Sequence, residues 1–497
     1  MKKLILLLAI MVLSHDVFFA QSCLPEGITF TTQEEIDNFQ TNNPGCTEIE
    51  GNVNINGLNQ INNLNGLIGL TAIGGNLRIH QNFSLTSLSG LNNLVTLGGS
   101  LEIAFNPMLL SLAGLENIDP GSLDDLVIHD NSALENCGVE SVCEYLSSPN
   151  GHVDIYNNAG ECRNAPAIAA ACGFSLSCLP FGDYYFFSQA DVDNFNADYS
   201  NCTELAGIVK ISGNDITNLN SLNEVTSMGV YLAIIQNPLL NSLSGLVSLF
   251  SVDGAVSIGY NPSLTNLEGL ENLTSVGGYL SIYNNNTLTK LMGLENLTTI
   301  GDMLEIIDNE NLVDLTALNN LTNIGNFLWI RHNTSLTSLS GLDHIAPGSI
   351  TYLVLAFNFS LTTCEVESIC IYLAAPNGTI EIHDNAPGCN SQAEVEQACL
   401  EIGIEEPAVG NQQFPVMVYP NPFDGSITFE YFLDEDALVN FSILDHLGRQ
   451  VALLVNEKQH KGRQVVAWNA KNLPPGVYYC RLKTGNQIIS KKIIKMK

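Results

Sequence analysis

The chain has few basic residues and few tryptophans for its length. Of its 497 residues only 18 are lysine or arginine, against 51 aspartate and glutamate, and two are tryptophan. Residues 22–409 hold five basic side chains against 43 acids, whereas residues 410–497 carry a net charge of +4. A surface with so few cations repels phosphate groups, so the composition excludes nucleic acid as a partner and argues against anionic lipid. The acids keep a long repeat surface soluble.

Sequence motifs of catalysis are also missing. There is no H-E-x-x-H zinc motif, no glycine-rich phosphate loop after a strand, and no serine or cysteine placed as a nucleophile. The His-Asp pairs that begin at His129 and His383 occupy equivalent strands, so duplication explains them. We therefore predict a protein that is not an enzyme and needs no cofactor or metal. A secreted hydrolase stays as a remote alternative, because a pair of carboxylates in a cleft leaves no motif.

Long apolar runs are absent except near the N-terminus. Lys2 and Lys3 precede the apolar run 4–13, which is too short to span a bilayer. This pattern is typical of a secretory signal peptide, which we place at residues 1–20. The sequence therefore predicts an exported protein with no transmembrane segment.

What the chain has in abundance is one short strand. Thirteen segments read apolar-x-apolar, mostly 24 residues apart, and in twelve of them an asparagine follows the second apolar residue by three positions. Such a period indicates a solenoid, in which each repeat buries its apolar face only against its neighbours. We expect the asparagine side chains to form an inward ladder that pairs backbone groups at a tight corner. The set is Asn82, Asn106, Asn131, Asn158, Asn214, Asn237, Asn261, Asn285, Asn309, Asn333, Asn358 and Asn385.

Twelve of the thirteen cysteines form two matched sets, which indicates a duplicated module. The last three spacings are 6, 19 and 10 residues in both sets, and the modules hold five and eight repeat strands. Even cysteine numbers in an exported chain predict disulfides, and the spacing disfavours zinc. Many pairings are open, and we favour those that close the ends of each repeat array: Cys23–Cys46, Cys137–Cys162, Cys143–Cys172, Cys178–Cys202, Cys364–Cys389 and Cys370–Cys399. Cys480 is left over and is expected to be a buried strand residue.

The strand motif, the asparagine position and the capping cysteines together resemble the receptor L domain. This is the leucine-rich-repeat-like coil of the ectodomains of insulin and epidermal growth factor receptors. The resemblance covers residues 23–172 and 178–399 and implies two mainly β, β-helical solenoid domains. No ligand-binding residue can be carried over from it.

The composition changes after Cys399. Residues 400–415 are acidic and aperiodic, which is typical of a linker. Residues 416–497 hold short β-rich runs between turn residues, which predicts a small Ig-like antiparallel β-sandwich.

This last segment resembles the C-terminal sorting domain of proteins exported by the bacterial type IX secretion system. The matching residues are Tyr419, Pro420, Asn421, Pro422, Gly448, Arg449, Gly476, Val477 and Tyr478. The resemblance implies that the type IX machinery is a partner. It also implies delivery to the outer surface of a Gram-negative bacterium, by release or by attachment to surface lipopolysaccharide.

Exposed strand positions of the second array provide the candidate binding surface: Tyr279, Tyr283, Phe327, Trp329, Arg331 and Tyr352. Aromatic side chains beside an arginine are typical of binding hot spots, and flat rings also suit sugar stacking. The alternative is that these rings pack against one another across strands, or against the other array. We therefore hypothesise a secreted or cell-surface protein for binding or adhesion, with a protein or glycan ligand. A structural surface-layer component without a ligand is the alternative function.

Overall fold

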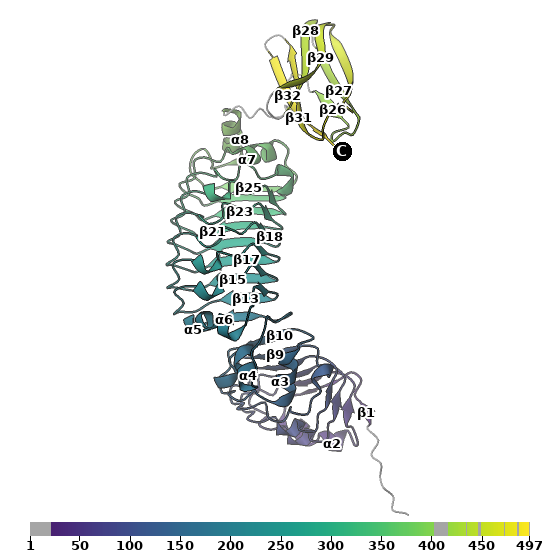
Figure 1. Cartoon of the computed structure of the whole chain (residues 1–497), viewed down its shortest axis with the longest axis vertical. Coiled ribbons are helices and arrows are strands. Elements are labelled where there is room, and N and C mark those ends of the chain that lie inside the picture. The colour runs from purple at the N-terminus through teal and green to yellow at the C-terminus, as the bar shows by residue number, and fades with distance from the viewer. Residues whose placement is uncertain are drawn as a thin grey trace, which may run out of the picture. The chain divides into compact units, whose positions relative to one another are not determined.

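The computed structural model describes residues 21–401, 416–433, 435–445, 449–471, 473–484 and 487–496 (Figure 1). The expected signal peptide, Gly448 of the sorting motif and nearly all of the expected linker lie outside these residues. The chain divides into two compact units between residues 402 and 403. Parallel sheets build the N-terminal unit and antiparallel sheets build the C-terminal unit, so the predicted mainly β class is confirmed.

The first array of the N-terminal unit forms a six-stranded parallel sheet in the order β10-β9-β8-β6-β4-β2. Its strands are β2 (Ile28–Phe30), β4 (Val53–Ile55), β6 (Leu77–His80), β8 (Leu101–Ala104), β9 (Leu126–His129) and β10 (Val153–Tyr156). A second parallel sheet joins β1 (Ser22–Cys23), β3 (Glu48–Ile49), β5 (Ala72–Ile73) and β7 (Thr96–Leu97). The main sheet has one strand more than the five repeat strands, because β2 pairs with β4 although no ladder asparagine follows it.

The second array forms a nine-stranded parallel sheet in the order β11-β13-β15-β17-β19-β21-β23-β24-β25. Its strands are β11 (Tyr184–Phe186), β13 (Ile208–Ile211), β15 (Tyr231–Ile235), β17 (Ala255–Gly259), β19 (Leu280–Tyr283), β21 (Leu304–Ile307), β23 (Phe327–Arg331), β24 (Tyr352–Ala356) and β25 (Thr379–His383). Six two-residue strands form its second sheet: β12 (Glu204–Leu205), β14 (Ser227–Met228), β16 (Ser251–Val252), β18 (Ser275–Val276), β20 (Thr299–Ile300) and β22 (Asn323–Ile324). Here β11 is the strand beyond the eight repeats.

Stacked apolar rows fill the interior of each array. In one repeat Leu77, Ile79 and the leucines that recur every third residue from Leu85 to Leu97 are all buried. The chain turns through short 3-10 segments such as η2 (Ser89–Leu91). A Cβ atom at Gly90 would lie 1.8 Å from the carbonyl oxygen of Leu64, so only glycine fits where successive coils touch.

The asparagine ladder is present and supports the corner after most strands of the two main sheets. Asn106 donates from Nδ2 to the carbonyl oxygens of Ile79 (2.8 Å) and Ala104 (3.0 Å), and its backbone N–H donates to Oδ1 of Asn131 (2.9 Å). The residue before the asparagine is left-handed, with φ of 57° at Phe105, a conformation that non-glycine residues rarely adopt. The buried amide hydrogen bonds hold that corner in place.

Asn214 does not join the ladder, contrary to the prediction. Its side chain is exposed, and the backbone N–H of Gly213 donates instead to Oδ1 of Asn237 (2.9 Å). Neither Gly213 nor Asn214 has a positive φ, so this corner lacks the left-handed residue that turns the asparagine inward elsewhere. In the second array the ladder therefore begins at Asn237.

Short helices close both ends of each array. The first array has α1 (Gln33–Asp37) and α2 (Phe39–Asn42) at one end, and α3 (Glu140–Ser147) and α4 (Ala165–Ala171) at the other. The second has α5 (Gln189–Asp193) and α6 (Phe195–Asp198), then α7 (Glu367–Ala374) and α8 (Gln392–Glu401). Disulfides tie these caps at the six pairs favoured from the sequence: Cys23–Cys46, Cys137–Cys162, Cys143–Cys172, Cys178–Cys202, Cys364–Cys389 and Cys370–Cys399.

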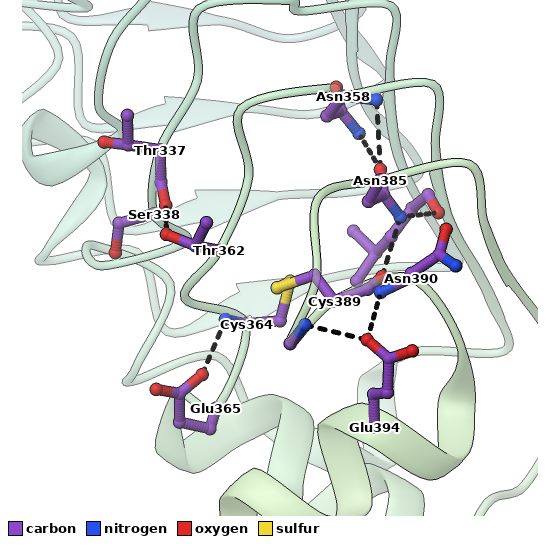
Figure 2. Close-up of a disulfide and its surroundings, with 12 residues drawn as sticks. Thr337, Ser338, Asn358, Thr362, Cys364, Glu365, Asn385, Cys389, Asn390 and Glu394 are labelled. Atoms are coloured by element: carbon purple, nitrogen blue, oxygen red, sulfur yellow. Dashed lines mark hydrogen bonds between the residues drawn. A yellow bond between two sulfur atoms is a disulfide. The ribbon is translucent and has the colours of Figure 1, made fainter.

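Figure 2 shows how one disulfide ends the ladder of the second array. Oδ1 of Asn385 accepts a hydrogen bond from the backbone N–H of Asn358 (3.0 Å), and Nδ2 of Asn385 donates to the carbonyl oxygen of Cys389 (3.0 Å). Cys389 forms the disulfide with Cys364. Glu394 of α8 accepts hydrogen bonds from the backbone N–H groups of Gly388 and Asn390. The last polar groups of the ladder are thus paired within the cap.

The C-terminal unit consists of two antiparallel sheets, which fit the predicted β-sandwich. One sheet joins β26 (Met417–Tyr419), β27 (Ser426–Leu433) and β30 (Gly462–Asn469). The other joins β29 (Gln450–Gln459), β28 (Ala437–Asp445), β31 (Gly476–Thr484) and β32 (Gln487–Lys495). Phe429 and Phe441 meet edge to face in the core at 4.9 Å.

Candidate functional site

Three of the six predicted binding residues form one aromatic group on the outer face of β23 and β24, here called the Trp329 cluster. The ring of Phe327 lies 5.6 Å from Trp329 and 5.7 Å from Tyr352, and Trp329 lies 6.0 Å from Tyr352. All three side chains are half-buried. Parallel register explains the contact, because Phe327 is the direct neighbour of Tyr352.

Tyr279 and Tyr283 are not part of this cluster. Tyr279 meets Tyr231 at 6.2 Å, and Tyr283 meets Tyr260 edge to face at 5.4 Å. Strand β21 separates these tyrosines from β23, since β21 pairs with β19 on one side and with β23 on the other. The six predicted residues therefore share one sheet face but form separate groups.

Two polar atoms beside the Trp329 cluster lack a hydrogen-bond partner. Nε1 of Trp329 and Nε of Arg331 are buried, and neither finds an acceptor among the described residues. Tyr352 is paired, because its hydroxyl donates to Glu381, and this hydrogen bond is the main cause that raises the pKa of Tyr352. Buried unpaired donors are rare in native structures, so these two N–H groups distinguish β23 from the other described strands of the second array.

The exposed face of the first array is polar over its central strands and aromatic at its end. Arg78 forms an ion pair with Glu102, with 2.6 Å between Nε and Oε2. His129 stacks on Tyr156 with 4.8 Å between ring centroids. Tyr156 in turn lies 4.2 Å from Tyr185, a residue of the second array.

Tyr185 belongs to the place where the two arrays meet. The backbone N–H of Asp183 donates to the carbonyl oxygen of Val153 (2.9 Å), and Val153 also forms a parallel bridge with Gly182, so the first residue of β10 pairs with the residues just before β11. His152 contacts Asp183 with 3.1 Å between Nε2 and Oδ2, and this hydrogen bond is the main cause that raises the pKa of His152. Burial raises the pKa of the neighbouring Asp154.

The sequence prediction missed this junction and its aromatic residues. Tyr185 and Phe187 precede the first segment with a ladder asparagine, so the repeat pattern did not mark their strand. Tyr260 was also missed, because it lies at the left-handed corner just beyond the alternating strand positions. The signal that could have found it is its place immediately before the ladder residue Asn261.

The sorting-motif residues in the C-terminal unit mainly hold its strand ends together. Asn421 donates from Nδ2 to the carbonyl oxygen of Lys492 (3.1 Å) and accepts the N–H of Ile494 on Oδ1 (2.9 Å). Arg449 pairs with Asp445 at 2.8 Å, and the hydroxyl of Tyr478 donates to the carbonyl oxygen of Pro474 (2.9 Å). The motif therefore joins the first and last strands of the unit.

The remaining motif residues and the leftover cysteine have simple places in this unit. The hydroxyl of Tyr419 lies 3.0 Å from Glu430, and Gly476 and Val477 begin β31. Cys480 is buried in β31, as expected, and burial raises the pKa of its thiol to about 11. A thiol with such a pKa is a weak nucleophile at neutral pH.

The described part of the chain has neither a metal site nor a membrane-spanning helix. Within the described ranges, no three His, Cys, Asp or Glu side chains come together as a metal site. No helix among them has the length and hydropathy needed to cross a bilayer.

Two family models match the chain. The model described as receptor L domain matches residues 45–164 and 250–346, one stretch in each array. The model described as secretion system C-terminal sorting domain matches residues 417–496. No curated protein gives a match. Both family resemblances drawn from the sequence motifs are confirmed.

Proposed function

We propose that this protein, which carries receptor L domains and a secretion system C-terminal sorting domain, is exported by the type IX secretion system and binds a ligand outside the cell. The sorting domain supports the export route, and the receptor L domains support a secreted or cell-surface location. Six disulfides fit an oxidising environment. Residues 23–172 and 178–399 are the proposed extents of the two repeat domains, with 400–415 as the linker and 416–497 as the sorting domain.

The Trp329 cluster carries the binding proposal. Aromatic side chains with an adjacent arginine dominate the binding energy of many interfaces, because they bury a large area with few rotatable bonds. Here Phe327, Trp329 and Tyr352 are half-buried and are positioned by mutual ring contacts. The unpaired donors of Trp329 and Arg331 lie on the same strand. We propose a non-enzymatic protein for adhesion or recognition whose ligand, a protein or a glycan, contacts this cluster.

One observation favours a second function, that of a structural surface component without a ligand. The three rings contact one another across β23 and β24, which alone stabilises a sheet by up to about 1 kcal/mol per pair. In that case the cluster would serve the fold only.

Binding arrays distinguish the two functions. The exported protein and its Trp329→Ala variant are applied to printed glycans and to extracellular proteins, with Phe359→Ala as control because Phe359 is a 62 % exposed ring outside the cluster. The binding proposal predicts a ligand whose affinity falls about tenfold or more in Trp329→Ala, as for a hot spot. Equal binding by the wild type and both variants would show that the ligand does not contact the Trp329 cluster. Turnover in a hydrolase screen would support the enzyme alternative instead.

A further inference from the structure

A groove runs along one margin of the second array, beside the ends of strands β11 to β19. Its volume is about 740 Å³, which is within the usual range for ligand sites. Its main lining side chains are Phe187, Asn214, Gln236, Tyr260, Asn284 and Asn286, and the rest of the wall is serine, glycine and proline. None of these residues belongs to the Trp329 cluster.

The amide side chains of the groove are unusual because they are free. Asn214 is exposed because it does not enter the ladder, and Gln236 and Asn284 are left-handed corner residues with φ of 59° and 55°. Within the described ranges, none of the side-chain amides of Asn214, Gln236, Asn284 and Asn286 makes a hydrogen bond to another residue. Each amide both donates and accepts, which matches the hydroxyl groups of a sugar.

Two aromatic rings stand among these amides in fixed positions. Tyr260 is 50 % exposed, and the ring of Tyr283 packs against it edge to face at 5.4 Å. Phe187 stacks beside Tyr185 at 5.6 Å, with Nζ of Lys210 at 5.7 Å from its centroid. Three strand spacings of about 4.8 Å separate the rows that hold them, which gives roughly 14 Å between the two rows. That length suits a short oligosaccharide rather than a single sugar ring.

The charge of the groove restricts the ligand further. No aspartate, glutamate, lysine or arginine lines it. Residues 22–409 carry few cations and many acids, so an anionic polysaccharide would meet repulsion that Lys210, beside Phe187, offsets only in part. The observations favour a ligand with many hydroxyls, apolar ring faces and no charge.

From these contacts we propose that the groove is a second binding site, which takes a neutral oligosaccharide. The amides of Asn214, Gln236 and Asn284 pair with sugar hydroxyls. The rings of Phe187 and Tyr260 stack on the apolar C–H faces of two separate sugars, since aromatic side chains present large, flat apolar surfaces. The site extends the proposed binding function to a surface that the Trp329 cluster does not include.

Affinity electrophoresis of the exported protein tests this inference. The gels contain a neutral polysaccharide (a β-glucan, a mannan or a xylan) or an anionic one (alginate or polygalacturonate). The expected result is retardation by a neutral polysaccharide, with about tenfold weaker binding for Tyr260→Ala and for Phe187→Ala, the effect of losing one ring contact. Asn214→Ala should weaken binding several-fold without affecting folding, since Asn214 is exposed and outside the ladder.

A matched control separates the groove from the rest of the surface. Phe250→Ala removes another exposed ring, 57 % accessible and outside the groove, and should bind like the wild type. Retardation only by anionic polysaccharides, no retardation by any neutral one, or unchanged binding by Tyr260→Ala would each overturn the inference. Binding that needs Trp329 but not Tyr260 would overturn it while leaving the proposed function in place, and the reverse pattern would support the groove against the cluster.

Discussion

The two repeat arrays carry different chemistry on their exposed faces, although their interiors are built alike. The central strands of the first array present the ion pair of Arg78 and Glu102, whereas β23 and β24 of the second present the Trp329 cluster. Beneath these faces both arrays have the same asparagine ladder, the same apolar rows and the same disulfide caps. Duplication has kept what holds the coil together, and the faces have diverged. Residues that differ between the arrays are therefore the better candidates for function.

The largest expected effect is the loss of one ladder asparagine. If the interiors of the two arrays are equivalent, this loss should lower the free energy of unfolding by the same amount in either array. Asn285→Ala leaves the buried N–H of Asn261 unpaired and removes the side-chain hydrogen bonds to the carbonyl oxygens of Ile258 and Tyr283, of which the second still accepts the N–H of Tyr260. With about 1–3 kcal/mol for the unpaired N–H and about 1 kcal/mol for each of the two lost hydrogen bonds, we expect a loss of about 4 kcal/mol in the free energy of unfolding. Asn106→Ala should cost the same in the first array, measured by urea denaturation followed by circular dichroism.

Asn214→Ala is the control for that experiment, because this exposed asparagine lies outside the ladder. It should shift the urea midpoint very little. A loss below about 1 kcal/mol for Asn285→Ala would contradict the view that the ladder supports the corners.

The second largest effect is expected at the disulfide caps. Cys137–Cys162 and Cys364–Cys389 both close loops with a sequence separation of 25 residues. Loop-closure entropy then predicts the same stabilisation, about 3 kcal/mol, for each bond. The double variants Cys137→Ser/Cys162→Ser and Cys364→Ser/Cys389→Ser should lower the urea midpoint by similar amounts. Clearly unequal losses would show that the caps are not interchangeable.

The repeated interior could be predicted from the sequence because nearly every repeat has the same apolar strand positions and the same asparagine after them. The spacing of Leu77 and Ile79 fixed which strand face is buried, and the matched cysteine spacings pointed to the caps. Strands β2 and β11 were not expected, because helices α1 and α5 follow them in place of a ladder asparagine.

The contacts on the exposed face could not be predicted, because the size of neighbouring residues decides where a ring lies. The ring of Tyr283 lies over Gly259, where a Cβ atom would come within 2.3 Å of it, and there it meets Tyr260. Tyr279 reaches Tyr231 across the strand that carries the small Ala255. The alternation of residues along a strand tells on which face of the sheet a side chain lies, but not in which direction along the sheet it points.

A smaller effect is expected from pH at the junction of the arrays. His152 faces Asp183, with Asp154 and Asp125 nearby, and its pKa is raised mainly by the hydrogen bond to Asp183. The folded chain therefore holds this proton more tightly than the unfolded chain. The stabilisation is complete below about pH 6.5, the ordinary histidine value, and is lost as the pH rises through the raised pKa. Because the imidazole is 42 % exposed, the effect should stay below about 1 kcal/mol.

The second array has Thr379 where the first has His152, so His152→Thr makes the two ends alike. This variant should flatten the dependence of the urea midpoint on pH between about 6 and 8. His344→Thr, at an exposed site, should leave that dependence unchanged. A profile that His152→Thr does not alter would assign the dependence to other groups.

The smallest effect on stability is expected at the ion pair of Arg78 and Glu102 on the exposed face of the first array. Their side chains are 49 % and 23 % exposed, and exposed ion pairs contribute about 0.2–1 kcal/mol. Glu102→Gln should therefore lower stability by a few tenths of a kcal/mol at low salt, and by nothing measurable at about 1 M NaCl, where the charges are screened. Urea midpoints at the two salt concentrations measure this. If the loss persisted at high salt, the polar face of the first array would matter to folding. If it vanished, that face would be free to vary, as the aromatic face of the second array has done.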